Sequence, residues 1–176
     1  MNKTFKIIYV CVFILYNSIS YGADMVGYLL DQAIKHYNDK NYSEAYTALN
    51  NIAPTGNPVV IYLLGNMYLN GNGTEKNIKV AHDMILYASE NLPNTNIELA
   101  TDAQMILIEM YLNGDPSVKN DIQAYKWAYI VNSTNNNLTA SILIKLANTL
   151  SDEEISLASN KAKEFIKRIK KNKNED

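Results

Sequence analysis

Side chains that commonly carry catalysis or bind metals are few in this chain. Its two histidines, His36 and His82, lie far apart in the sequence. Neither has a second histidine or a cysteine at the spacing of a metal site, and His36 has only Asp39 and Lys40 near it. His82 adjoins Asp83, but two neighbouring residues do not make a ligand set. We therefore expect surface roles for both histidines.

The other residues that could act in catalysis or hold a phosphate also lack the context of an active site. Cys11, the only cysteine, lies in an apolar run near the start, and no serine stands in the context of a nucleophile elbow. The acids Asp152 and Glu153 suit the start of a helix better than acid–base catalysis, because exposed neighbours there do not face one substrate. Segment 70–74 is glycine-rich but follows a predicted helix and lacks the Lys-Ser/Thr that holds phosphate. The sequence predicts a non-enzymatic protein with no catalytic, cofactor-binding or metal-binding residues.

The first 22 residues have the layout of a secretory signal peptide, with two lysines, the apolar run Ile7–Leu15 and small residues after it. Cleavage is expected after Gly22 or Ala23. An uncleaved anchor is the alternative, although the run is shorter than the roughly 20 residues that span a bilayer. Removal of residues 1–22 would leave no cysteine. We expect an exported protein, periplasmic or secreted, with no stable membrane span after signal removal.

Composition and charge indicate a soluble globular body, with 47% apolar residues. Without residues 1–22, fourteen basic residues stand against eighteen acidic ones, a net charge of −4. Residues 23–160 hold seven lysines and fifteen acids, net −8, whereas residues 161–176 hold seven basic and three acidic residues, net +4. An acidic body argues against a nucleic-acid partner, which is held largely by phosphate neutralisation.

Two stretches share one pattern at an offset of 43 positions. Leu64, Tyr68, Gly71, Asn77, Ala81 and Met84 are matched by Leu107, Tyr111, Gly114, Asn120, Ala124 and Trp127. Such self-similarity is typical of helical repeats, which stack to bury their apolar faces. Gly65 costs about 1 kcal/mol in a helix interior relative to Ala, so we expect a neighbouring helix to approach closely there.

Apolar periodicity and turn residues define the expected helices. They are a pair within Asp24–Ala53, then Pro58–Leu69, Asn77–Glu90, Ile97–Leu112, Asp121–Val131, Thr139–Thr149 and a last helix after Ser151. Gly71 and Gly73 are expected in a turn, Asn91–Asn96 as a polar link, and Ser151 with Glu154 as a capping box. The apolar side of the last helix is expected to comprise Ile155, Leu157, Ala158, Ala162, Phe165, Ile166 and Ile169.

The last helix is expected to close the open end of the stack. Its basic end, Lys167–Lys173, has two interpretations. In the first, the cations interact favourably with the negative carboxyl end of the helix dipole and increase solubility. In the second, they contact anionic lipid or an acidic partner.

The pattern Leu64-Gly65-x2-Tyr68-x2-Gly71-x-Gly73-x3-Asn77-x3-Ala81 resembles a Sel1-like repeat, and the stretch 43 positions later resembles a more divergent copy. The resemblance implies an all-α fold, a right-handed α/α solenoid of Sel1-like, tetratricopeptide-like helical pairs over residues 23–160. Residues 161–176 would be the end of a capping helix and a basic tail. Asn77 and Asn120 stand where the family usually has Asp. The family uses its concave face to bind proteins or peptides.

If the first helix of each pair lines that face, the candidate partner-binding residues are Tyr62, Asn66, Leu69, Met105, Glu109 and Leu112. Their mixture of apolar and polar groups suits a protein partner. The alternative is that half of them belong to the core between repeats. Our leading hypothesis is a non-catalytic protein-binding scaffold. An immunity protein that neutralises a toxin in the periplasm is the second hypothesis, and an enzyme acting on cell-wall material is the third.

Overall fold

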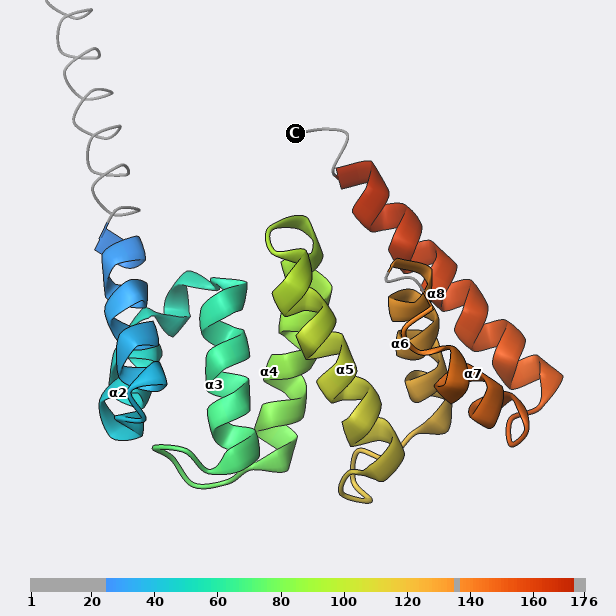
Figure 1. The fold of residues 1–176 in the computed structure, drawn as a ribbon, viewed down its shortest axis with the longest axis horizontal. Coiled ribbons are helices and arrows are strands. Elements are labelled where there is room, and N and C mark those ends of the chain that lie inside the picture. The colour runs from blue at the N-terminus through green and yellow to red at the C-terminus, as the bar shows by residue number, and fades with distance from the viewer. Residues whose placement is uncertain (1–24, 135–136, 173–176) are drawn as a thin grey trace, which may run out of the picture.

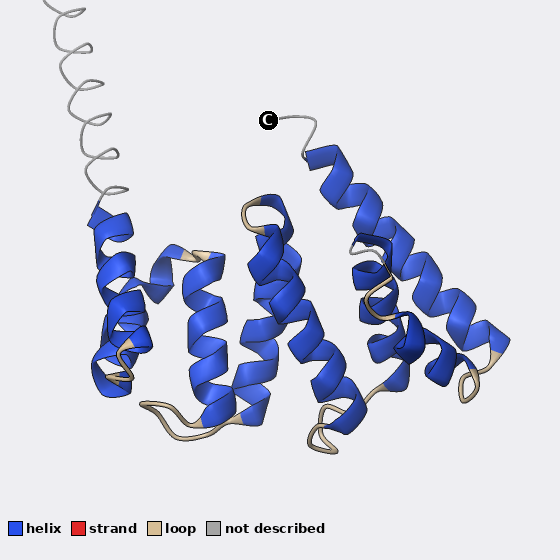
Figure 2. Ribbon diagram, in the orientation of Figure 1, coloured by secondary structure: helices blue, strands red, loops and turns tan. Residues whose placement is uncertain are grey.

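The computed structural model describes residues 25–134 and 137–172, which form helices joined by turns, with no strand among them (Figure 1, Figure 2). A first helix covers residues 25–38. It is followed by α2 (Tyr42–Ile52), the 3-10 turn η1 (Ala53–Thr55), α3 (Pro58–Asn70), α4 (Ile78–Asn91), the 3-10 turn η2 (Leu92–Asn94), α5 (Ile97–Asn113), α6 (Asp121–Thr134), α7 (Ala140–Ala147) and α8 (Asp152–Asn172). The predicted signal peptide falls on residues 1–22, outside the described residues. No helix in the described ranges is both long and apolar enough to cross a membrane.

Helices close in the chain pack side by side, so the fold runs as a row from the first helix at one end to α8 at the other (Figure 1). α3 packs mainly against α4 and α5 mainly against α6, while α4 also packs against α5 and so joins the two pairs. α6 contacts both α7 and α8. The all-helical class predicted from the sequence is confirmed.

Buried side chains form two separate clusters along this row. The first cluster unites the first helix, α2 and α3, and its buried members are Ala33, Ala45, Leu49, Ile52, Val60, Leu64 and Met67. The second cluster spans α4 to α8 and includes Trp127, which is fully buried and meets Phe165 of α8 edge to face at 5.4 Å between ring centres. Trp127 therefore packs between α6 and α8.

Local signals explain where α3 begins and ends. The Asn57 side chain accepts a hydrogen bond from the Val59 amide at 2.9 Å, and Pro58 occupies the first turn, where its missing N–H costs nothing. Gly71 ends the helix with φ of 74°, a left-handed conformation that glycine adopts without strain. The predicted bounds of this helix are correct to within one residue.

Gly65 is buried where α3 crosses α4. A Cβ atom added there would lie 2.8 Å from Ile85 Cδ1, 3.0 Å from Ile85 Cγ1 and 3.2 Å from Met84 Cβ. These distances are below ordinary van der Waals contact between carbon atoms. The predicted close approach at Gly65 is confirmed, and the neighbour is the partner helix of the same pair.

The link between α4 and α5 differs from its prediction. Asn91–Asn96 was expected to be a polar connection, but Leu92 and Pro93 are buried within η2. The Thr95 and Asn96 amides both donate to the Leu92 carbonyl, at 2.9 and 2.7 Å. The turn thus folds back on itself, and its apolar residues pack against α5 and α8.

The predicted capping box of α8 is confirmed. Ser151 donates from its amide and its hydroxyl to Glu154 Oε2, both at 2.9 Å, and the Glu154 amide donates back to Ser151 Oγ at 3.3 Å. Ala158, Ala162 and Phe165 are buried as expected, but Leu157 is 48% exposed. Its position directly precedes Ala158, so its side chain lies to one side of the buried stripe.

Candidate functional site

The two copies of the repeat share one backbone framework. The Asn77 amide donates to the Tyr68 carbonyl at 2.9 Å, and 43 positions later the Asn120 amide donates to the Tyr111 carbonyl at 3.0 Å. Each bond ties the start of a second helix to the end of the first helix in its pair. The offset seen in the sequence is therefore present in the hydrogen bonding of the two pairs.

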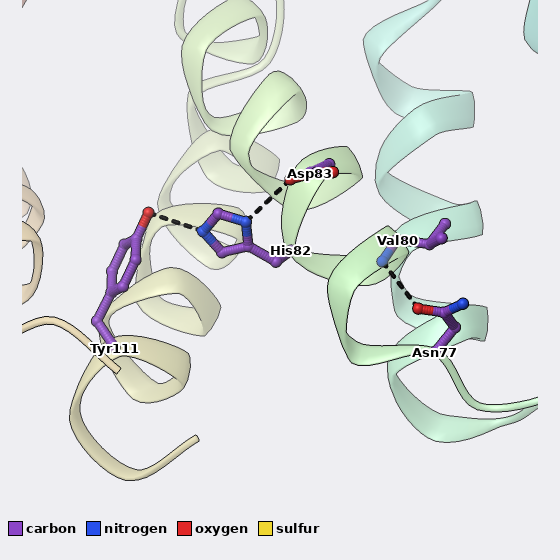
Figure 3. Close-up of polar contacts among 5 residues, drawn as sticks. All are labelled: Asn77, Val80, His82, Asp83 and Tyr111. Carbon is purple, nitrogen blue, oxygen red and sulfur yellow. Dashed lines mark hydrogen bonds and ion pairs between the residues drawn. The ribbon is translucent and has the colours of Figure 1, made fainter. Parts of the chain in front are cut away.

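The same asparagines cap the second helices. Asn77 Oδ1 accepts from the Val80 amide at 3.1 Å (Figure 3), and Asn120 Oδ1 accepts from the Gln123 amide at 3.0 Å. A side-chain oxygen at this position satisfies an amide that has no partner within the helix. Asparagine thus provides the oxygen acceptor that an aspartate would provide.

The glycine-rich turn between α3 and α4 uses its polar groups internally. The Gly71 and Asn72 amides both donate to the Met67 carbonyl, at 2.8 and 3.0 Å, so these two donors close the helix end. Gly73 has φ of 71° and lies against the Tyr42 carbonyl, where a Cβ atom would clash. The predicted role of these glycines in a turn is confirmed, and Gly73 also allows a close contact with the start of α2.

Of the six candidate partner-binding residues, three lie on successive turns of α3. The Asn66 side chain donates to the Tyr62 carbonyl at 3.3 Å, and Leu69 follows one turn later. Tyr62 is partly buried against the second core cluster. Burial raises the pKa of its hydroxyl, an interaction with Asn66 lowers it, and the charge of Asp102 raises it.

Leu69 and Glu109 line one hollow of about 590 Å³ between α3 and α5, which we call the α3–α5 hollow. Its apolar wall also includes Ile78, Ile106 and Met110, while Lys76 adds a positive charge opposite in sign to Glu109. Glu109 is exposed, and its Oε1 accepts from the Asn113 side chain at 3.2 Å. The hollow combines an apolar wall with charges of both signs.

Met105 and Leu112 do not line the α3–α5 hollow. Met105 is partly buried against the second core cluster. Leu112 is also partly buried there and lines a different hollow of about 330 Å³, together with Ile142 and Lys145 of α7. The structure thus brings Leu69 and Glu109 together, keeps Tyr62 and Asn66 on the same helix as Leu69, and sets Leu112 apart.

His82 departs from the expectation of a surface role. Its side chain is only 17% exposed, and its ring lies edge to face with Tyr111 at 5.4 Å between centres. The His82 Nε2 and Tyr111 hydroxyl are 2.9 Å apart, while the Nδ1 is 3.1 Å from Asp83 Oδ1 (Figure 3). His82 therefore links α4 to α5 across the boundary between the two pairs. No sequence pattern predicts this contact, because His82 and Tyr111 are 29 positions apart.

Hydrogen-bonding chemistry sets the direction of this Asp83–His82–Tyr111 chain when the imidazole is neutral. An ionised carboxylate only accepts, so Nδ1–H donates to Asp83. Nε2 then has a lone pair and accepts from the Tyr111 hydroxyl. The hydroxyl proton of Tyr111 is thereby held by His82.

The environment of Tyr111 keeps it protonated at neutral pH. Burial raises the pKa of its hydroxyl to about 12, with smaller increases from the charges of Glu90 and Asp83, and an interaction with the Trp127 indole opposes them. A hydroxyl that holds its proton so firmly is a poor nucleophile and a poor general base. The chain of hydrogen bonds therefore acts as a structural link between helices.

A third hollow, of about 630 Å³, is lined in part by this hydrogen-bonded chain. We call it the lysine hollow, and its charged lining comprises Lys79, Asp83, Glu90, Lys119 and Lys126. α4, α5 through Tyr111, the loop 114–120 and α6 each contribute to its wall. Leu86 and Val118 supply apolar surface. Sequence reasoning missed this site because the loop and three helices assemble it only in the folded chain.

Within residues 25–134 and 137–172, no group of three or more His, Cys, Asp or Glu side chains is placed to hold a metal ion. Comparison with models of known protein families and with characterised proteins finds no significant match to this chain.

Proposed function

We propose that this protein is a non-catalytic, protein-binding scaffold of Sel1-like, tetratricopeptide-like helical pairs, arranged as a right-handed α/α solenoid that α8 closes. The observation that carries the proposal is the framework repeated at an offset of 43 residues, in which Asn77 with Tyr68 and Asn120 with Tyr111 occupy equivalent places. Repeated helical pairs that pack on their neighbours present extended surfaces suited to macromolecular partners.

The proposed binding surface is the face of α3 and α5 that carries Tyr62, Asn66, Leu69 and Glu109. The α3–α5 hollow supports this choice, because its apolar wall can receive an apolar side chain while Lys76 and Glu109 meet polar groups at the edge. Met105 and Leu112, the other two candidates from the sequence, lie outside this hollow: both pack against the second core cluster, and Leu112 lines the hollow beside α7. The proposed partner is a protein or a peptide.

A capture experiment tests this surface. The double variant Leu69→Gln/Glu109→Lys should lose the proteins that the wild type retains from an envelope extract of the source cells. The matched control, Leu157→Gln/Glu98→Lys, changes the same residue types at exposed positions outside the hollow and should retain them. A Leu69/Glu109 variant that has wild-type helicity and still captures the same proteins would refute the surface.

Export to the periplasm or the medium completes the proposal, and its basis is the signal-like layout of residues 1–22. Purification from the source cells, followed by N-terminal sequencing, should give a chain beginning at Ala23 or Asp24. A chain that retains residues 1–22 and stays in the membrane fraction would show an uncleaved anchor instead.

A role as an immunity protein is the second candidate, and the net charge of −8 over residues 23–160 favours it. An acidic body can attract a basic toxin over a long range and speed its capture. Deletion of the gene should then sensitise cells to a toxin encoded beside it. A general scaffold predicts no such sensitivity, so this measurement separates the two roles.

A further inference from the structure

Lysines are scarce in the body of this protein, and they are not evenly placed. Residues 23–160 contain seven lysines and fifteen acids. Three of the seven lysines, Lys79, Lys119 and Lys126, line the lysine hollow. They come from α4, the loop before α6 and α6 itself, so their convergence is a product of the fold and not of one basic segment.

The acids in the same wall offset two of the three positive charges, which leaves a net charge of +1. Asp83 is 70% exposed and accepts from His82 Nδ1 at 3.1 Å, which engages one of its oxygens. Glu90 is the other acid in the lining, and it lies close enough to Lys126 to favour the charged ammonium. The lining thus holds three ammonium groups and two carboxylates within a body where acids outnumber lysines two to one.

Lys126 is the least solvated of the three lysines. It is partly buried, and its Nζ lies 4.3 Å from the centre of the Trp127 ring. It forms no ion pair with any residue of the described part of the chain. Burial lowers the pKa of its ammonium, Glu90 raises it, and Lys161 and Arg168 of α8 lower it. A partly desolvated cation with two like charges nearby gains most from an added anion.

The remaining lining groups suit a ligand larger than a bare ion. Asn120 uses its side-chain oxygen to cap α6, which leaves its amide NH₂ as a donor. Gln123 adds a second side-chain amide, and Leu86 and Val118 add apolar contact. The volume of about 630 Å³ is within the range of small-ligand and side-chain pockets.

We propose that the lysine hollow is a binding site for carboxylate groups, held by Lys119 and Lys126 with Lys79 at the edge. A carboxylate fits better than a phosphate for two reasons. Glu90 in the wall repels a dianionic phosphate more strongly than a singly charged carboxylate, and the lining residues include no arginine, whose guanidinium binds phosphate with two hydrogen bonds. The carboxylate belongs either to an acidic segment of a protein or to a free organic acid. The site shares no lining residue with the α3–α5 hollow, so a test of carboxylate binding here does not depend on the proposed protein-binding surface.

Trp127, the only tryptophan in the sequence, provides a direct signal, because the Lys126 ammonium lies over its ring. The purified protein is titrated, at about 0.15 M salt to screen weak surface attraction, with a blocked oligoglutamate peptide while Trp127 emission is recorded. Oligoglutamine of equal length, free glutarate and inorganic phosphate are titrated in parallel. Oligoglutamate should give a saturable change in emission, and oligoglutamine should give none.

Three variants locate the site. Lys126→Met keeps an unbranched stem of similar length, and Lys119→Gln changes an exposed residue that cannot disturb the core. Each should weaken oligoglutamate binding by at least about tenfold, the loss expected for a charge-assisted contact. Lys35→Gln, which removes an exposed lysine of the first helix, should leave binding unchanged.

The outcomes divide cleanly. Glutarate binding as tightly as oligoglutamate supports the site and identifies a free acid as its ligand, whereas preference for the peptide identifies a protein segment. No saturable binding of either carboxylate overturns the proposal, as does tighter binding of phosphate. Equal weakening by Lys35→Gln and Lys119→Gln would also overturn it, because the attraction would then come from overall charge.

Discussion

Gly65 offers the sharpest test of how the first repeat is packed. In Gly65→Ala, the new methyl group would lie 2.8 Å from Ile85 Cδ1 and 3.2 Å from Met84 Cβ. The Ile85 methyl can move, since it ends a flexible side chain. The Met84 Cβ is attached to the backbone of α4, so it can move only if the two helices separate.

Two opposing terms set the size of the effect. Replacing glycine by alanine inside a helix stabilises it by about 1 kcal/mol, whereas overpacking a tight contact costs about 1–3 kcal/mol. Steric cost should win, and the free energy of unfolding should fall by up to about 2 kcal/mol. Gly27→Ala is the matched control, because no atom lies within 4 Å of its added Cβ. It should raise stability by up to about 1 kcal/mol.

Urea unfolding followed by circular dichroism measures these changes. Ile85→Val removes the Cδ1 atom that meets the new methyl and should alone cost about 0.5–1.5 kcal/mol. In that background Gly65→Ala should cost less than in the wild type, which a double-mutant cycle reports as a favourable coupling. Stabilisation of the wild type by Gly65→Ala, equal to that by Gly27→Ala, would refute the close-packing role of Gly65.

Three further predictions follow from single contacts. Asn77→Ala and Asn120→Ala should each cost about 1 kcal/mol in urea unfolding, because each removes an equivalent helix cap; a loss at one position alone would contradict the shared framework. Tyr111 has a raised pKa of about 12 against 10.0 for an unperturbed tyrosine, so it stabilises the fold fully below pH 10. That contribution is lost as pH rises to about 12, and the stability of the wild type relative to Tyr111→Phe should decline over this window. Hydrogen bonds from Ser151 lower the pKa of the Glu154 carboxyl in the folded protein. The ionised carboxylate therefore stabilises the fold above pH 4.5, the ordinary pKa of Glu, and this stabilisation is lost as the pH falls through the lowered pKa. Melting curves recorded on acidification should show a smaller loss for Glu154→Gln than for the wild type.

The helix boundaries were predictable because their signals are local. Asn57-Pro58 and Gly71 determine the ends of α3 through backbone conformation and caps, and Ser151 with Glu154 determines the start of α8. Prediction failed where burial depends on a distant element. Leu92 lies in a turn that would be exposed in an isolated pair, yet it is fully buried in the second core cluster.

The core stripe of α3 shows the same limit. A helical stripe through Leu64 and Gly65 would also place Ile61 and Tyr68 inward. The structure instead buries Val60 and Met67 with Leu64 and Gly65, while Ile61 and Tyr68 are only partly covered. α3 packs against α2 as well as α4, and its sequence is apolar nearly all round, so periodicity alone does not identify the buried side.

The candidate sites were predictable only in part. The repeat indicated that Leu69 and Glu109 belong to first helices of successive pairs, and the structure places both in the α3–α5 hollow. The bond between His82 and Tyr111 depends on how α4 is rotated against α5, a tertiary property that helical spacing does not encode. The lysine hollow likewise requires the loop 114–120 to fold over α4.

The division of the buried side chains into two clusters has a consequence for how binding acts on this chain. α3 belongs to both clusters, since Leu64 and Met67 lie in the first while Val59 and Tyr62 pack against the second. α3 therefore forms the boundary between the two clusters, which we call the seam. A partner seated in the α3–α5 hollow would touch Leu69 on one side of the seam and Met110 on the other. It would clamp the two halves together and suppress local opening of the amino-terminal half, so occupancy of one surface would stiffen the whole row.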